Sequence, residues 1–408
     1  MSSLRVIGAN GGPVGVIGGW EVSMERTAAL RLDAEWARTG PGRDALPARE
    51  HERTLRDLIA ALAPHARTDL PCAARLGLRY ADLARHCFDT GRRTEALLAA
   101  HEAVRRCAEP ARHDPEHARW YAAALLGQSV YLAEPLRDEL GLPRYAFQPD
   151  GDRPPAAARA DGLAALAAAR RAVGVWERLG GADPRDLEGL ARAHAFLGDR
   201  LEELGDPVES AARAAVAEGR FRELDPAPAG RDSPYAAALE HLGDQLERRL
   251  RRCPFRGGLT RLRAAGQLPE RLLPLAVVAA RVEGVEPDAI ARGLGLEPAE
   301  ARRILRARSW RAVWRFDVRE VPGAPWTPMA RPWHGADAVT DRSAAQVAAE
   351  LTDAFRNAPG RPPEPAHWRI AVWWEDEDQE AGARFRRTHA SARRDDGGAA
   401  RRAVESHP

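Results

Sequence analysis

A two-helix pattern that recurs along residues 77–250 restricts this chain to mainly helical folds. In its clearest copy, the first helix has an inward face at positions i, i+3, i+4 and i+7, which lie together on an α-helix. The residues on that face are Tyr80, Leu83, Ala84 and Cys87. Gly91 predicts the end of the helix, because glycine readily adopts the left-handed conformation common at helix ends. A second helix follows, and its inward face comprises Ala96, Ala100, Ala103 and Cys107.

The same arrangement returns farther along the chain. One copy comprises His194, Leu197, Gly198 and Leu201, then Gly205, then Ser210, Ala214, Ala217 and Phe221. Another comprises Ala123, Leu126, Gly127 and Val130, then Ala165, Ala169, Ala172 and Trp176, with a proline-containing insert near 133–160. A last first helix comprises Leu239, Leu242, Gly243 and Leu246. Small residues let paired helices approach closely, and each pair leaves an apolar face uncovered. We therefore predict a solenoid of stacked helical hairpins over residues 71–255.

Two further features accompany this pattern. Helix starts are predicted where a capping residue precedes a proline, at Asp114-Pro115, Asp183-Pro184 and Ser233-Pro234.

The segment Tyr80–Val104, YADLARHCFDTGRRTEALLAAHEAV, resembles the tetratricopeptide repeat. Its equivalent small residues are 43, 71 and 45 residues apart, against about 34 in that family. Residues 24–70 are expected to form N-terminal helices, which would be a degenerate first copy. The alternative is an unspecialised bundle of alanine-rich helix pairs.

The resemblance implies a cytoplasmic protein-interaction scaffold with a regulatory role. A concave surface of first helices would bind a protein, a peptide or a second copy of the chain. From their offset against the inward face, we expect four residues to be exposed there as partner contacts. These are Arg79, Asp82, Arg200 and Gln245.

Residues 268–308 form a second distinct segment, read as three short helices. Leu268-Pro-Glu-Arg opens it, Gly284 ends the first helix, and Gly295 predicts a tight turn before a third helix that begins at Pro298. The plan is similar to region four of bacterial sigma factors, a helix-turn-helix unit. The resemblance implies that the third helix enters the major groove of DNA. Its DNA-contacting residues would be Arg302, Arg303, Arg306 and Arg308. A transcriptional regulator is therefore the alternative function, and a structural cap for the solenoid is an equal possibility for this segment.

Composition changes after Arg308, since seven of the eleven tryptophans lie between Trp310 and Trp374. Alternation of apolar and polar residues predicts strands near 314–318 and 368–374, with a helix over 343–355 between them. We expect a small α+β unit over residues 309–380. A disordered leader over 1–23 and a disordered tail over 381–408 complete the predicted organisation.

The remaining features exclude several classes of protein. The 61 basic residues, all of them Arg, nearly balance 59 acidic ones, so the chain is no polycation. Arg in place of Lys is typical of a GC-rich genome. The longest apolar run, Leu272–Ala280, is too short to cross a bilayer. The four cysteines lack zinc-site spacing, which favours a reducing cytoplasm. The glycine-rich residues 8–15 are not followed by the second strand of a βαβ unit, so they do not predict a dinucleotide-binding loop. The acidic residues near 375–380 lack the spacing and glycine of an EF-hand, so they do not predict a cation site. We predict no enzyme, no cofactor and no metal.

Overall fold

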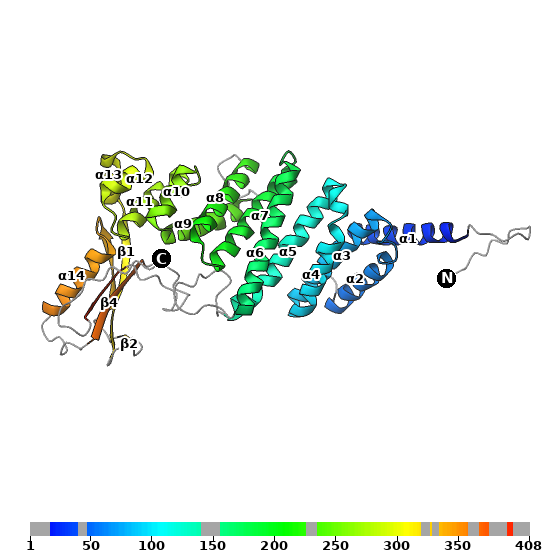
Figure 1. Ribbon diagram of the computed structural model, residues 1–408, viewed down its shortest axis with the longest axis horizontal. Coiled ribbons are helices and arrows are strands. Elements are labelled where there is room, and N and C mark those ends of the chain that lie inside the picture. Colours follow the sequence, from blue (N-terminus) through cyan, green and yellow to red (C-terminus); the bar gives the residue numbers. More distant parts are fainter. Residues whose placement is uncertain are drawn as a thin grey trace, which may run out of the picture. The chain divides into compact units, whose positions relative to one another are not determined.

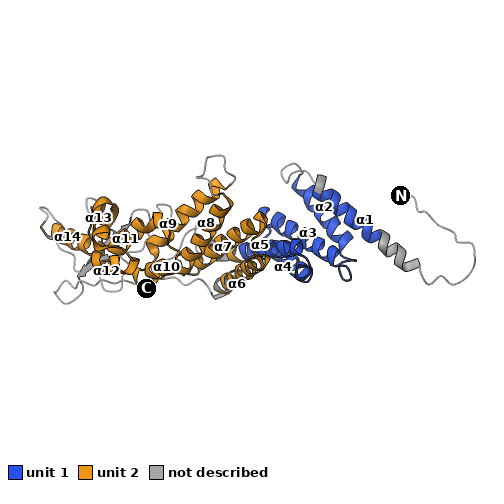
Figure 2. Ribbon diagram, turned by 90° about the horizontal axis from the view of Figure 1, so that it is seen from above, with its two compact units in different colours: residues 1–131 blue, residues 132–408 orange. Residues whose placement is uncertain are grey.

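The computed structural model of the chain is mainly helical (Figure 1). It describes residues 17–39, 47–139, 156–225, 235–319, 327–328, 334–357, 367–374 and 390–394. The chain divides into two compact units, residues 1–131 and 132–408, which Figure 2 distinguishes by colour. The mainly helical fold class predicted from the sequence is confirmed.

Unit 1 consists of helices. They are α1 (Ile17–Thr39), α2 (Ala48–Leu62), α3 (Leu70–Asp89), α4 (Arg93–Cys107), a 3-10 turn (Pro110–Arg112) and α5 (Pro115–Glu139) as far as Tyr131. Asp69 starts α3, since its side chain accepts a hydrogen bond from the Cys72 backbone N–H at 2.8 Å. The predicted inward residues Ala84, Ala96 and Ala100 are buried between α3 and α4.

Unit 2 begins with the end of α5 and continues with long helices. These are α6 (Ala156–Leu179), α7 (Pro184–Glu203), α8 (Pro207–Leu224) and α9 (Ala236–Arg252). Helices α7 and α8 form a hairpin in which the Ser210 hydroxyl donates a 2.8 Å hydrogen bond to the Gly198 carbonyl oxygen. Gly198 allows this close crossing, because a Cβ atom there would lie 2.9 Å from Arg249 Nη1 and 3.2 Å from the Ser210 carbonyl oxygen, closer than most Cβ contacts. The small residues predicted at this crossing are therefore buried as expected.

The two clearest hairpins share one turn geometry. Gly91 and Gly205 both have positive φ, at 79° and 85°. In unit 1 the Arg92 N–H donates to the Cys87 carbonyl, and in unit 2 the Asp206 N–H donates to the Leu201 carbonyl. Each is the bond from the second residue after the helix cap to the third-last helical residue, the Schellman ending. The predicted helix starts at Pro115 and Pro184 are also observed, while Ser233-Pro234 lies outside the described residues.

One predicted helix face is wrong. In α5, Ala123 is exposed and Leu126, Gly127 and Val130 are only partly buried. The buried residues on this helix are Ala118, Ala122, Ala124, Leu125, Gln128, Ser129, Leu132 and Ala133. The segment Ala122–Leu126 is apolar at every position, so its periodicity fits two registers about one residue apart and the sequence alone selects neither.

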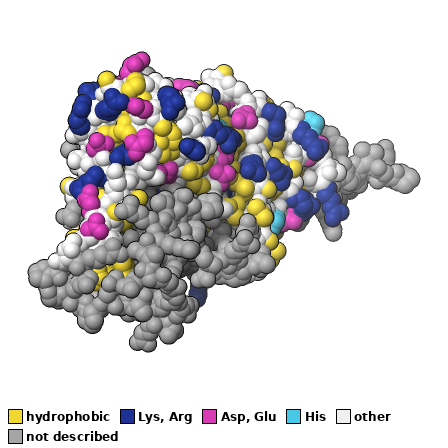
Figure 3. Space-filling model, turned by 60° about the vertical axis from the view of Figure 1, so that its left-hand side comes forward, with side chains coloured by type: hydrophobic (Ala, Val, Ile, Leu, Met, Phe, Trp, Pro, Cys, Tyr) yellow, Lys and Arg dark blue, Asp and Glu magenta, His cyan; other side chains and the backbone are white. Residues whose placement is uncertain are grey.

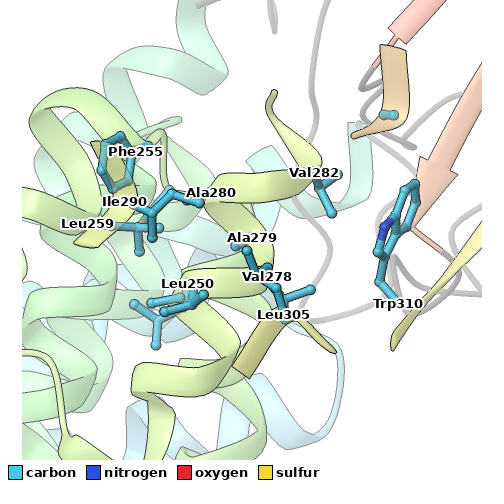
Figure 4. Packing of buried hydrophobic residues seen from close by; sticks show 14 of the residues in the cluster. Leu250, Phe255, Leu259, Val278, Ala279, Ala280, Val282, Ile290, Leu305 and Trp310 are labelled. Carbon is cyan, nitrogen blue, oxygen red and sulfur yellow. The ribbon is translucent and has the colours of Figure 1, made fainter. Parts of the chain in front are cut away.

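After α9 the chain forms a cluster of short elements. A π-type turn (Phe255–Leu259) leads into α10 (Thr260–Ala264), a 3-10 turn (Glu270–Leu272), α11 (Leu273–Val282), α12 (Pro287–Leu294) and α13 (Pro298–Ala307). Figure 4 shows side chains from several of these elements packed together, including Leu250, Phe255, Ile290 and Leu305. The predicted three-helix segment is thus confirmed as three helices.

An antiparallel sheet follows directly from α13. Its strands are β1 (Ser309–Arg319), β2 (Thr327–Pro328), β3 (His334–Thr340), β4 (His367–Trp374) and β5 (Ala390–Arg394), with α14 (Ala344–Asn357) between β3 and β4. β2 and β3 pair with one edge of β1, β4 pairs with the other, and β5 pairs with β4. Phe316 of β1 packs on Phe355 of α14 and stacks on Trp368 of β4, with ring centroids 4.1 and 5.3 Å apart. Both predicted strands and the predicted helix are present.

A single hydrophobic core joins these parts of unit 2. Its buried residues run from Ala211 on α8 through α9, the short helices and β1 to Val372 on β4. The boundaries expected at residues 255, 268 and 309 therefore do not separate independent cores. The reason is that α11 and the start of β1 offer apolar side chains on more than one side, so each packs against several neighbours.

Three other boundaries differ from expectation. Helix α1 begins at Ile17, within the leader expected to be disordered. The expected insert near 133–160 is helical at both ends, where α5 extends to Glu139 and α6 begins at Ala156. Strand β5 lies within the tail expected to be disordered, because pairing with β4 supplies the hydrogen bonds that the segment lacks alone. Residues 8–15, 140–155 and the acidic run 375–378 lie outside the described residues.

Candidate nucleic-acid interface

The candidate site is the outer face of α13, and its position is set by a short turn. Gly295 ends α12 with φ 65°, a left-handed conformation, and the Leu296 N–H donates to the Ala291 carbonyl at 2.9 Å. Proline occupies the first turn of both α12 and α13, where its missing N–H removes no helical bond. A three-residue connection thus joins the two helices, as a helix-turn-helix plan requires.

The inner face of α13 is fixed by packing. Ala301, Ile304 and Leu305 are buried, and Ile304 and Leu305 belong to the same core as Ile290 of α12 and Val277 of α11. The helix also lies against β3. Ile304 takes the place of a residue that is usually polar in the resembling family, and the structure explains why it is apolar here.

The four predicted arginines, three of them on α13 and Arg308 directly after it, all face solvent. The exposed side chains are Arg302, Arg303, Arg306 and Arg308. They occupy the positions that the buried residues Ala301, Ile304 and Leu305 do not take. Over the described part of the chain, Arg306 and Arg308 have no acidic partner, so their guanidinium groups are available to an incoming anion. The prediction that these side chains are accessible is therefore confirmed, whereas their role stays a prediction.

The other two arginines have acidic neighbours. Arg302 Nη2 lies 2.5 Å from Asp288 Oδ1, which joins α13 to α12. Arg303 Nη2 lies 3.9 Å from Glu300 Oε1, beyond hydrogen-bonding distance. Figure 3 shows basic and acidic side chains interspersed on the visible face of this end of the molecule. The outer surface of α12 and α13 is consequently mixed in charge.

Sequence reasoning missed two residues of this surface, Asp288 and Arg292. Both are exposed on α12, one helical turn apart, and the Arg292 Nε donates to the Asp288 backbone oxygen at 3.3 Å. The available signal was the apolar pattern of α12: with Ile290, Ala291 and Leu294 inward, positions 288 and 292 must point outward.

Polar contacts join α11 to the segment between β3 and α14. Arg281 of α11 is buried, and its guanidinium donates to the Asp341 backbone oxygen and to Gln346 Oε1 at 3.2–3.4 Å. Asp341 is in the left-handed region, with φ 49°. The end of α11 is also bonded to the turn before α10, because the Phe255 N–H donates to Glu283 Oε2 at 2.9 Å. These contacts hold α11 in one orientation and, through it, α12 and α13.

The four residues predicted as protein contacts are not exposed as expected. Arg79, Arg200 and Gln245 are buried, and Asp82 is partly buried. Arg79 donates to Asp33 Oδ1 at 2.6 Å and to Asp82 Oδ2 at 2.7 Å. Arg200 pairs with Glu203 at 2.9 Å, and Gln245 Nε2 lies 2.8 Å from the His241 ring nitrogen. The prediction of exposure is wrong because residues beside the inward face of one helix are covered by the next helix.

The described residues offer no metal site, since no group of three or more His, Cys, Asp or Glu side chains lies close enough together to hold an ion. Burial raises the pKa of the Cys107 thiol to about 12 and that of Cys72 to about 11. A thiol with so high a pKa is not a nucleophile at neutral pH. Over the same residues, no helix has both the length and the apolar character needed to span a membrane.

Comparison with protein-family models and with curated proteins finds no match for this chain.

Proposed function

We propose that this chain is a transcriptional regulator that binds duplex DNA through α13. One observation carries the proposal: three exposed arginines lie on α13 and a fourth, Arg308, follows it directly, while the opposite face of the helix is packed into a core next to a helix-turn-helix connection. An α-helix fits the major groove, and arginine there binds phosphates or guanine edges. The free guanidinium groups of Arg306 and Arg308 would be the first to reach a phosphate.

The binding is expected to depend mainly on phosphate contacts. The surface of α12 and α13 is mixed in charge, so its attraction to DNA is local rather than a property of the whole chain, whose formal net charge is +2. The logarithm of the binding constant should fall linearly with the logarithm of the salt concentration, with a slope of about 0.9 for each phosphate neutralised. The four arginines therefore set an upper limit of about four on the size of this slope.

Fluorescence anisotropy with a labelled mixed-sequence duplex tests the proposal. The full-length chain is compared at low and physiological salt with the Arg306→Ala, Arg308→Ala double variant. The matched control is Arg185→Ala with Arg192→Ala, which removes the same charge from exposed positions of α7. Salt-sensitive binding that only the α13 variant loses supports DNA binding. Absence of binding at either salt, or equal loss in both variants, would leave residues 268–308 as a structural part of the core.

A second candidate function is a scaffold of the tetratricopeptide type, with the helical hairpins stacking as a solenoid. The recurrence of one hairpin geometry in both units, with buried small residues and the same glycine turn, favours it. Because the expected contact residues are buried, a partner would have to use other side chains. Leu98 of α4 is the most exposed large apolar residue among those described. A second copy of the chain is the partner that can be tested directly.

Sedimentation velocity over a range of protein concentrations measures self-association of the full chain. We expect concentration-dependent dimers that the Leu98→Arg variant weakens. A monomer at every concentration would refute self-association through this surface.

A further inference from the structure

We propose that Asp288 competes with DNA phosphate for Arg302, and so limits how tightly the α13 surface binds duplex DNA. This inference rests on the DNA binding proposed above. It assigns to α12 a regulatory acidic residue that lies directly beside the arginine row.

The geometry places Asp288 where a phosphate would have to sit. Its Oδ1 accepts from Arg302 Nη2 at 2.5 Å, so a carboxylate already occupies a donor of that guanidinium. Both side chains are open to solvent, with 51% of Arg302 and 62% of Asp288 exposed. A phosphate oxygen arriving from solvent can therefore reach the same donor, and carboxylate and phosphate are alternative partners for it.

Asp288 differs from the other acidic side chains near this surface. Glu300 lies 3.9 Å from Arg303 and forms no hydrogen bond with it. Arg306 and Arg308 have no acidic partner within the described ranges. Of the three arginines on α13 and Arg308 after it, Arg302 alone is hydrogen-bonded to a carboxylate within those ranges. The charge of Arg302 is thus neutralised by Asp288 of the neighbouring helix α12, whereas the other three arginines have no such hydrogen bond in the part of the chain that the structure describes.

The exchange has a definite electrostatic consequence. When phosphate takes Arg302, the Asp288 carboxylate loses its partner and faces the negatively charged DNA backbone. Replacing Asp288 by Asn keeps the shape of the side chain and its hydrogen-bonding oxygen but removes the charge. Arg302 then contributes a full phosphate contact, which should steepen the salt slope by about 0.9. Because of this extra contact, the ratio of the Asp288→Asn affinity to the wild-type affinity should be about threefold smaller at about 200 mM salt than at about 50 mM.

The experiment measures binding of a labelled mixed-sequence duplex by fluorescence anisotropy. The wild-type chain is compared with Asp288→Asn at about 50 and 200 mM salt. Asp244→Asn is the matched control, because it makes the same charge change at an exposed position of α9. The Asp288→Asn, Arg302→Ala double variant tests whether the gain passes through Arg302. Circular dichroism verifies that all variants are folded.

We expect Asp288→Asn to bind several-fold more tightly than wild type at the lower salt, with a gain about threefold smaller at the higher salt. Asp244→Asn should bind like wild type, and the double variant should lose the gain. Binding by wild type with no gain in Asp288→Asn would overturn the inference and leave the DNA-binding proposal standing. An equal gain in Asp244→Asn, or a gain that persists without Arg302, would also overturn it. No binding by any variant refutes both.

Discussion

His194 should make the folded chain sensitive to mild acid. It lies on α7, only 4% exposed, and its Nδ1 atom has no hydrogen-bond partner. Burial, aided by the positive charges of Arg213 and Arg220, lowers the pKa of His194 to about 4. In the unfolded chain the pKa of a histidine is about 6.5. The folded state therefore keeps the ring neutral at pH values where the unfolded chain binds a proton.

The sign of the effect follows from that difference. As pH falls below about 6.5, the unfolded state gains a proton that the folded state does not, so the free energy of unfolding decreases. With pKa values of about 4 and 6.5, the loss between pH 7 and pH 5 is about 2 kcal/mol. The loss levels off only once the pH is below the folded pKa.

Urea unfolding, followed by circular dichroism at both pH values, measures this loss. The His194→Leu variant cannot titrate, so its stability should fall by about 2 kcal/mol less than that of wild type over the same interval. At pH 7 the variant should be at least as stable, because it no longer buries an unpaired nitrogen. His113→Leu, at an exposed position, is the control and should behave like wild type. Equal pH dependence in wild type and His194→Leu would refute the reasoning.

Four further substitutions test the packing. Gly198→Ala should lower the free energy of unfolding by about 1–3 kcal/mol in urea titrations, because its Cβ would contact the Ser210 carbonyl. Gly219→Ala, where a Cβ meets nothing within 4 Å, should instead raise it by about 0.5–1 kcal/mol. Asp33→Asn removes the carboxylate 2.6 Å from the buried Arg79, which keeps Asp82 at 2.7 Å, and should cost about 1–3 kcal/mol, seen as faster hydrogen exchange in α1 and α3. Trp368→Ala should cost about 3–5 kcal/mol, and an unchanged melting temperature would contradict its place in the core.

The local elements could be predicted from the amino-acid sequence alone. Spacing of small and apolar residues located the α3–α4 and α7–α8 hairpins, and glycine chemistry located the turns at Gly91, Gly205 and Gly295. Alternation located the strands around Phe316 and Ile370. These features are set within a few residues of the chain, so short-range pattern and backbone preference are enough to predict them.

Which polar side chains are buried could not be predicted from the sequence, because it depends on the packing of distant elements. Arg79 and Gln245 lie beside an inward face, and the sequence does not show that a neighbouring helix buries them. The buried face of α5 could not be predicted for a related reason, because its central segment Ala122–Leu126 is apolar at every position and takes its orientation from the neighbouring helices. The pair of Asp288 with Arg302 likewise depends on how α12 and α13 cross. Exposure and ion pairing are properties of distant residues brought together, and a local pattern carries no record of them.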